Sequence, residues 1–207
     1  MATKKLITIF AFLVTPFLAY AEDWVFDAVL NDKVIGRHTF IVDDKKSLSR
    51  ADFHINFLFM DIYYQHSSEE TWSNGCIQSI SSSTNDDGDH FSVKGKVENS
   101  HLALVSNNTL IKLSECVMTF AYWDKNILKQ KRLLNSQNGE YLDVDIRLLK
   151  KETIRVRGES TPTQHYEIKA TKDGQEKLAI QLWYDDNLNW VALKSPTPIG
   201  DIFYKLH

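Results

Sequence analysis

The sequence has 207 residues, of which 43% are hydrophobic, and a formal net charge of −3 from 24 basic and 27 acidic side chains. The acidic excess argues against nucleic acid as a partner, because proteins that bind phosphate backbones carry a basic face. The length is sufficient for one domain with a substantial hydrophobic core.

Residues 1–21 have the pattern of a secretory signal peptide. Two lysines precede an apolar run at 6–14, and Ala19 and Ala21 place small residues where a signal peptidase cleaves. The alternative, a membrane anchor, is less favoured because the apolar run is far shorter than the roughly 20 residues of a spanning helix. We therefore expect a mature chain that begins at Glu22, has a formal net charge of −5 and contains no transmembrane segment.

The rest of the chain consists of short alternating segments separated by turn signals. Asn-Gly or Asp-Gly pairs, which tolerate the positive φ of tight hairpin turns, begin at Asn74, Asp87, Asn138 and Asp173. Such regular spacing is typical of antiparallel sheets. The predicted strands are 23–30, 34–43, 48–59, 62–72, 76–84, 90–97, 101–105, 110–120, 140–149, 152–157, 164–172, 177–184, 189–195 and 201–206.

So many short strands predict an all-β fold in a single domain, 22–207. The expected architecture is a curved antiparallel sheet, either a half-barrel or a more closed, barrel-like sheet, with one short helix. The helix is expected at 124–131, because Asp124 is a good N-cap and cations follow at the end of the segment. One apolar face of such a sheet needs a cover. The segment 115–141, apolar and aromatic in its first half, is the best candidate.

Cys76 and Cys116 are the two cysteines of the chain. The oxidising compartment of an exported protein favours a disulfide between them. The enclosed loop of about 40 residues corresponds to on the order of 4 kcal/mol of stabilisation in the chain-entropy model. Two free buried cysteines are the main alternative. A metal pair or a reactive thiol is less favoured, because the sequence has no C-x-x-C motif and no histidine at ligand spacing.

No catalytic or metal-binding motif stands out, so we expect no catalytic residue, no metal site and no cofactor. The seven histidines lack the spacing of zinc ligands, and no serine lies in a G-x-S-x-G motif. The aspartates of 84–90 are interpreted as a hairpin turn rather than a calcium loop. His66 and Glu70 are interpreted as a solvent-facing pair, too far apart along a strand for one metal. A site assembled from distant residues is still open.

Aromatic residues make up 12% of the chain. The ordinary explanation is a packed β core, and the alternative is an apolar pocket for an acyl chain or a similar ligand. The residues expected to contact such a ligand are Phe57, Phe59, Phe120, Tyr122, Trp123, Ile127 and Leu128.

Four stretches resemble an uncharacterised family of exported proteins from Gram-negative bacteria, known only as a domain of unknown function. They are "FDAVLNDKVIGRHTF", "ETWSNGC", "CVMTFAYWDKNILKQKRLLNSQNGEYLDV" and "LWYDDNLNWVALKS". The last is also similar to the closing hairpin of a second uncharacterised periplasmic family with curved antiparallel sheets. Through that shape it is similar, more distantly, to the half-barrel lipoprotein and lipid carriers of the periplasm. The resemblance implies a periplasmic location and a curved all-β fold, and it supplies no catalytic residue.

Three functional hypotheses follow. The first is a non-enzymatic periplasmic protein whose partner is an apolar, lipid-like small molecule bound in the curved sheet. The second is an envelope assembly or interaction module with a filled core and a protein partner. The third is an enzyme that acts on a lipid or a cell-wall precursor.

Overall fold

The computed structural model describes residues 22–57, 60–113 and 116–207. The expected signal peptide, Phe59 and Glu115 lie outside the described residues. No helix within the described ranges is long and apolar enough to cross a membrane. The elements are β1 (Glu22–Leu30), β2 (Lys33–Val42), β3 (Lys46–Phe57), β4 (Met60–Ser73), β5 (Cys76–Asp86), β6 (Asp89–Glu98), β7 (His101–Ser106), β8 (Thr109–Leu113), the 3₁₀ helix η1 (Lys125–Lys129), β9 (Arg132–Leu134), β10 (Tyr141–Val156), β11 (Glu159–Lys172), β12 (Gln175–Asp185), β13 (Trp190–Thr197) and β14 (Gly200–Leu206).

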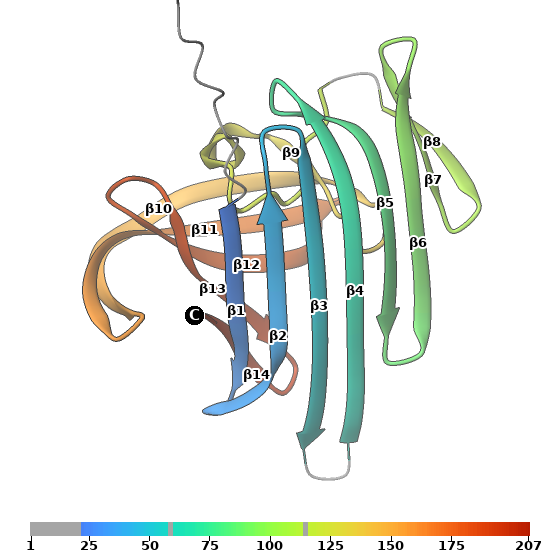
Figure 1. The fold of residues 1–207 in the computed structure, drawn as a ribbon. Helices are drawn as coiled ribbons and strands as arrows, with labels where there is room; N and C mark the ends of the chain where they lie inside the picture. The colour runs from blue at the N-terminus through green and yellow to red at the C-terminus, as the bar shows by residue number, and fades with distance from the viewer. Residues whose placement is uncertain (1–21, 58–59, 114–115) are drawn as a thin grey trace, which may run out of the picture.

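These 14 strands form one sheet in the order β8-β7-β6-β5-β4-β3-β2-β1-β14-β13-β12-β11-β10-β9. The chain thus makes two antiparallel meanders, β1–β8 and β9–β14, which meet where β1 pairs with β14. Figure 1 shows β1 to β4 side by side in one wall, with β10 to β12 crossing behind them. The predicted fold class, a curved antiparallel sheet with one short helix, is confirmed.

Three of the four predicted Asx-Gly turns are two-residue hairpin turns. At Asn74, Asp87 and Asp173 both the Asx residue and the glycine after it have positive φ, which two-residue hairpins require. The fourth pair differs, because there only Gly139 has a positive φ. That glycine ends a longer loop between β9 and β10.

Two parts of the predicted strand pattern were wrong. The strand expected at 110–120 stops at Leu113 as β8, and the apolar residues after Cys116 leave the sheet edge to cross its interior. The strands expected at 140–149 and 152–157 are one strand, β10. No turn-forming residue separates them, and a register shift after Leu148 absorbs the irregularity. The three-residue β9 was not predicted, because it is too short to show an alternating pattern.

Residues 116–119, called the bridge below, connect the two arms of the curved sheet. Ile77 N of β5 donates to Val117 O at 2.8 Å, and Leu134 N of β9 donates to Met118 O at 2.8 Å. The bridge therefore forms backbone hydrogen bonds with both β5 and β9. β9 is one edge of the sheet, whereas β5 lies three strands in from the other edge, β8.

A disulfide fixes one end of the bridge. Cys76 and Cys116 are bonded across a sequence separation of 40, as predicted. Cys76 is the first residue of β5 and precedes Ile77, the donor to the bridge. The covalent bond and the adjacent hydrogen bond thus hold the same strand end against the bridge.

Side chains of the bridge alternate between two hydrophobic clusters. Met118 belongs to the larger cluster, which includes Phe26 and Trp190. Val117 belongs to a smaller cluster, which includes Leu104 of β7. The period-two alternation of an extended chain produces this division, so the bridge is packed on both sides.

Residues 120–131, called the cover below, follow the bridge. Asp124 caps η1 by accepting a hydrogen bond from Asn126 N, as expected for an N-cap. Ile127 is fully buried in the larger cluster. Tyr184 Oη of β12 donates to Tyr122 O at 2.8 Å, which attaches the cover to the second meander.

The loop 135–139 lies against the inner face of β5 and β7. Three hydroxyls donate to three consecutive loop carbonyls: Ser82 Oγ to Ser136 O at 2.5 Å, Thr84 Oγ1 to Gln137 O at 3.0 Å and Ser106 Oγ to Asn138 O at 2.6 Å. At Gly139, with φ of 77°, a Cβ would lie 2.6 Å from Ser106 Cβ. Only glycine permits this approach, so the loop has a fixed position on the sheet.

We expect the double variant Cys76→Ala/Cys116→Ala to lose up to about 4 kcal/mol of unfolding free energy, because the closed loop no longer limits the unfolded chain. Urea denaturation measures it. Wild-type protein in excess reductant should lose a similar amount. Equal stability of variant and oxidised wild type would show that the bridge does not need the bond.

Candidate ligand-binding cavity

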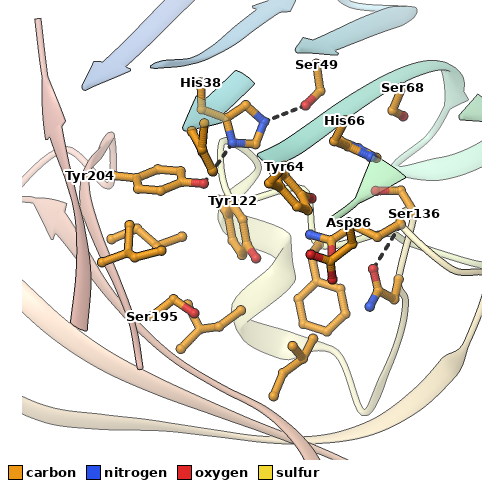
Figure 2. Close-up of a pocket in the computed structure, with 18 of the residues that line it drawn as sticks. His38, Ser49, Tyr64, His66, Ser68, Asp86, Tyr122, Ser136, Ser195 and Tyr204 are labelled. Atoms are coloured by element: carbon orange, nitrogen blue, oxygen red, sulfur yellow. Dashed lines mark hydrogen bonds between the residues drawn. The ribbon is translucent and has the colours of Figure 1, made fainter. Parts of the chain in front are cut away.

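A cavity of about 540 Å³ lies inside the curved sheet. Its volume is within the range of about 300–1,000 Å³ that is common for small-molecule sites. Its walls come from β2–β5, from β12–β14, from the cover and from the loop 135–139. Figure 2 shows the lining side chains that point toward this space from both meanders.

One side of the cavity is apolar. Leu178 and Ile180 of β12, Leu193 of β13 and Ile202 of β14 contribute aliphatic side chains. They come from the second meander, and the pairing of β1 with β14 brings both meanders around one space. This wall can bury an apolar chain.

The opposite wall is polar and is built mainly on β4. Five side chains at every second position of β4 line the cavity, and after the apolar Ile62 they are Tyr64, His66, Ser68 and Glu70. The interpretation of His66 and Glu70 as solvent-facing was wrong, since their exposed fractions are 5% and 3%. The register with β3 sets their direction, because His66 lies opposite the buried Ala51 and cross-strand partners share a face.

Glu70 is buried without a cationic partner among the described residues. Its carboxylate accepts hydrogen bonds from three hydroxyls: Ser47 Oγ at 3.2 Å, Ser68 Oγ at 3.1 Å and Thr119 Oγ1 of the bridge at 3.1 Å. Burial raises the pKa of Glu70 to about 7, and the three hydroxyl donors partly oppose that rise. Near neutral pH the group therefore exists as a mixture of acid and carboxylate.

His66 presents an unpaired acceptor to the cavity. Its Nδ1 lies 2.9 Å from Thr84 Oγ1, and the Thr84 hydroxyl already donates its hydrogen to Gln137 O. His66 Nδ1 must therefore carry the proton toward Thr84, which leaves Nε2 as a bare acceptor. No described residue hydrogen-bonds to this Nε2. Burial lowers the pKa of His66 to about 4, so the ring is neutral at pH 7.

His38 lies between two hydroxyls on the same polar side (Figure 2). Its Nε2 is 2.7 Å from Ser49 Oγ and its Nδ1 is 3.0 Å from Tyr204 Oη. Burial lowers its pKa well below the usual value, and nearby His66 lowers it further. Ser49 beside a histidine resembles a nucleophile–base pair. Its orienting partner is a phenol rather than a carboxylate, however, and Ser49 pairs with both β2 and β4 in mid-strand, where backbone amides are engaged. The arrangement fits a fixed polar contact better than a reaction centre.

The cavity carries little charge that can pair with an anion. Neither Lys nor Arg occurs among the described residues that line it. Burial raises the pKa of Tyr64, Tyr122 and Tyr204, so all three phenols are neutral. The lining contains two acidic residues, Glu70 and Asp86, and Asp86 lies at the exposed end of β5. Partial desolvation of its carboxyl raises the pKa of Asp86, and the nearby charges of Asp87 and Asp89 raise it further.

The predicted ligand-binding residues have different positions. Phe120, Tyr122 and Trp123 of the cover line the cavity, although their contact with a ligand stays a prediction. Ile127 and Leu128 pack in the larger hydrophobic cluster and do not line the cavity, because η1 directs them into the core. Phe57 ends β3, and Phe59 lies outside the described residues.

The polar wall was missed because β4 is polar on both faces. Gln65, Ser67 and Glu69 alternate with the inward residues, so polarity alone does not show which set points inward. The usable signal lies in β3, where Phe53 and Ile55 are buried. Phe53 pairs with Tyr64 across the β3–β4 hairpin, and His66 is on the same face two residues further along β4. Because paired residues share a face of the sheet, the burial of Phe53 would have predicted that Tyr64 and His66 point inward.

The described residues contain no group of three or more His, Cys, Asp or Glu that could hold a metal ion.

The curved sheet, its cover and the internal cavity define a β-barrel-like protein with a small-molecule-sized interior. A family model described as a domain of unknown function (DUF6134) matches residues 26–207, and the chain belongs to that family. It is also similar to a crystal structure of a β-barrel-like protein of domain of unknown function DUF1849 from Brucella abortus. The TM-score is 0.65 at 11% identity, over 90% of this chain and 95% of that one. At this identity the likeness shows the fold alone. A comparison with curated protein sequences gives no match.

We expect Glu70→Gln to gain stability relative to wild type as the pH rises. The folded-state pKa of Glu70 is raised from 4.5 to about 7, so the folded state retains a proton that the unfolded state releases. The wild type therefore loses stability as the pH rises from about 4.5 through 7, and the isosteric amide does not. The difference should grow by about 3 kcal/mol between pH 4 and pH 8.

Urea denaturation of both proteins across this range tests the expectation. His38 and His66 titrate in both proteins, so their effects cancel in the difference. Parallel stability curves would show that the Glu70 carboxyl is not desolvated in the folded protein.

Proposed function

We propose that this protein is a non-enzymatic periplasmic binding protein that takes up an apolar, lipid-like small molecule inside its curved sheet. The observation that carries the proposal is the cavity of about 540 Å³ with an aliphatic wall. Core side chains normally fill such space to the packing density of organic crystals. A cavity of this size lined by apolar groups and a few directed polar groups is the usual form of a ligand site.

The position of the cover supports uptake of a ligand. Phe120, Tyr122 and Trp123 contribute aromatic surface to the cavity, and aromatic side chains add large contact areas. On this proposal these three residues contact the apolar part of the ligand. Ile127 and Leu128 hold the cover in the core instead.

The compartment is part of the proposal. The expected cleavage before Glu22 would release a single domain, 22–207, into the periplasm. The Cys76–Cys116 disulfide supports this location, because such bonds persist in oxidising compartments.

We expect protein purified from the periplasmic fraction under mild conditions to carry an additional small-molecule mass. Native mass spectrometry measures this mass, and denaturation should release it. Leu178→Trp should lose most of it, because the larger side chain fills the cavity from its β12 wall. Leu148→Trp is the matched control, because Leu148 is an exposed residue of β10 and should retain the bound mass.

The other hypotheses give different results. A clean apoprotein mass for the wild type would contradict ligand uptake and favour an envelope interaction module. Conversion of an added lipid or cell-wall precursor, lost on Ser49→Ala, would contradict the non-enzymatic assignment.

A further inference from the structure

We infer that the polar end of the bound molecule is uncharged and donates a hydrogen bond, as the hydroxyl of a long-chain alcohol or an acylglycerol does. Fatty-acid anions and other anionic amphiphiles should be rejected. The inference rests on the proposed function and specifies the substrate class of the same cavity.

The first argument is the missing counter-charge. A carboxylate or phosphate that leaves water needs a cation or several hydrogen-bond donors to offset its desolvation. Neither Lys nor Arg is present among the described lining residues. Both lining histidines, His38 and His66, are neutral at pH 7 because burial lowers their pKa values. An anionic head group would find no positive charge there.

The second argument is repulsion by acids. Glu70 lies in the polar wall, and its carboxylate gains charge as the pH rises through about 7. Asp86 lies at the turn between β5 and β6 with Asp87 and Asp89 close enough to raise its pKa. A second negative charge in or near the cavity is therefore disfavoured.

A cationic head group has no free partner at the β4 wall. The Glu70 oxygens already accept three hydroxyl hydrogen bonds. A bound ammonium would have to displace these donors or share the carboxylate with them. The other lining carboxylate, Asp86, lies at the exposed end of β5, so at the β4 wall the structure favours a neutral head over either charge.

The third argument identifies the head group as a donor. His66 is 95% buried, and its Nε2 is an acceptor without a described partner. Its Nδ1 hydrogen is committed to Thr84, whose own hydroxyl hydrogen is committed to Gln137 O. A buried acceptor that loses water on ligand binding costs free energy unless the ligand donates to it. A hydroxyl supplies that donor.

The geometry also gives the ligand an orientation. Figure 2 shows His66 and Ser68 of β4 on one side of the cavity and Ser195 of β13 on the other, and β12–β14 also contribute the aliphatic part of the lining. A molecule with one hydroxyl end and one apolar chain matches this division. Its hydroxyl faces His66, and its chain lies against Leu178, Ile180 and Leu193.

Three ten-carbon probes test the inference: 1-decanol, decanoate and decyl methyl ether. Their binding to the mature protein at about pH 8 can be followed by tryptophan fluorescence, because Trp123 lines the cavity. We expect 1-decanol to bind at least about tenfold more tightly than decanoate, because the buried anion finds no partner. It should bind about threefold to tenfold more tightly than the ether, which accepts but does not donate a hydrogen bond.

Variants assign these preferences to residues. His66→Phe should abolish the preference for 1-decanol over the ether, and His90→Phe, an exposed residue of β6, should retain it. Glu70→Gln should narrow the gap between 1-decanol and decanoate at about pH 8. The ranking of the three probes on wild type is independent of whether any variant folds.

Two results separate the possible failures. The inference would be overturned, with ligand uptake left intact, if decanoate bound as tightly as 1-decanol. The same holds if folded His66→Phe still bound 1-decanol more tightly than the ether. No binding of any probe to the wild type would overturn the proposed function and the inference together.

Discussion

The attachment of the bridge to both β5 and β9 is the constraint on which the rest of the structure depends. An antiparallel sheet of this length has two open edges and one concave apolar face that must be covered. Hydrogen bonds from Ile77 and Leu134 to the bridge carbonyls connect the two arms of the sheet, and the disulfide fixes one end. The bridge then delivers the cover to the interior, so that closure and covering come from one segment.

The same closure gives the cavity its two chemical sides. β4 reaches the interior from the first meander with hydroxyl, imidazole and carboxyl groups, whereas β12–β14 supply most of the aliphatic lining from the second. Thr119 belongs to the bridge and also donates to Glu70, so the element that closes the sheet takes part in the polar wall. Glu70, whose hydroxyl donors come from β3, β4 and the bridge, therefore links the stability of the closed sheet to the proposed ligand site.

Local patterns in the sequence predicted the strands, most hairpin turns and the disulfide, because each depends on neighbouring residues or on the compartment. The bridge was not predicted, because its apolar run continues the pattern of β8 and only its distant partners, Ile77 and Leu134, distinguish it from a strand. The polar wall was not predicted for a related reason. His66 and Glu70 alternate with Gln65 and Glu69, and the direction of each set depends on pairing with β3.

The most direct test of this account is a crystal structure of the mature protein with 1-decanol. The account predicts one bound molecule in the cavity, with its hydroxyl within about 3 Å of His66 Nε2, as hydrogen-bond geometry requires, and its chain along Leu178, Ile180 and Leu193. A cavity filled by the protein's own side chains, or 1-decanol bound only on the outer face of the sheet, would contradict it.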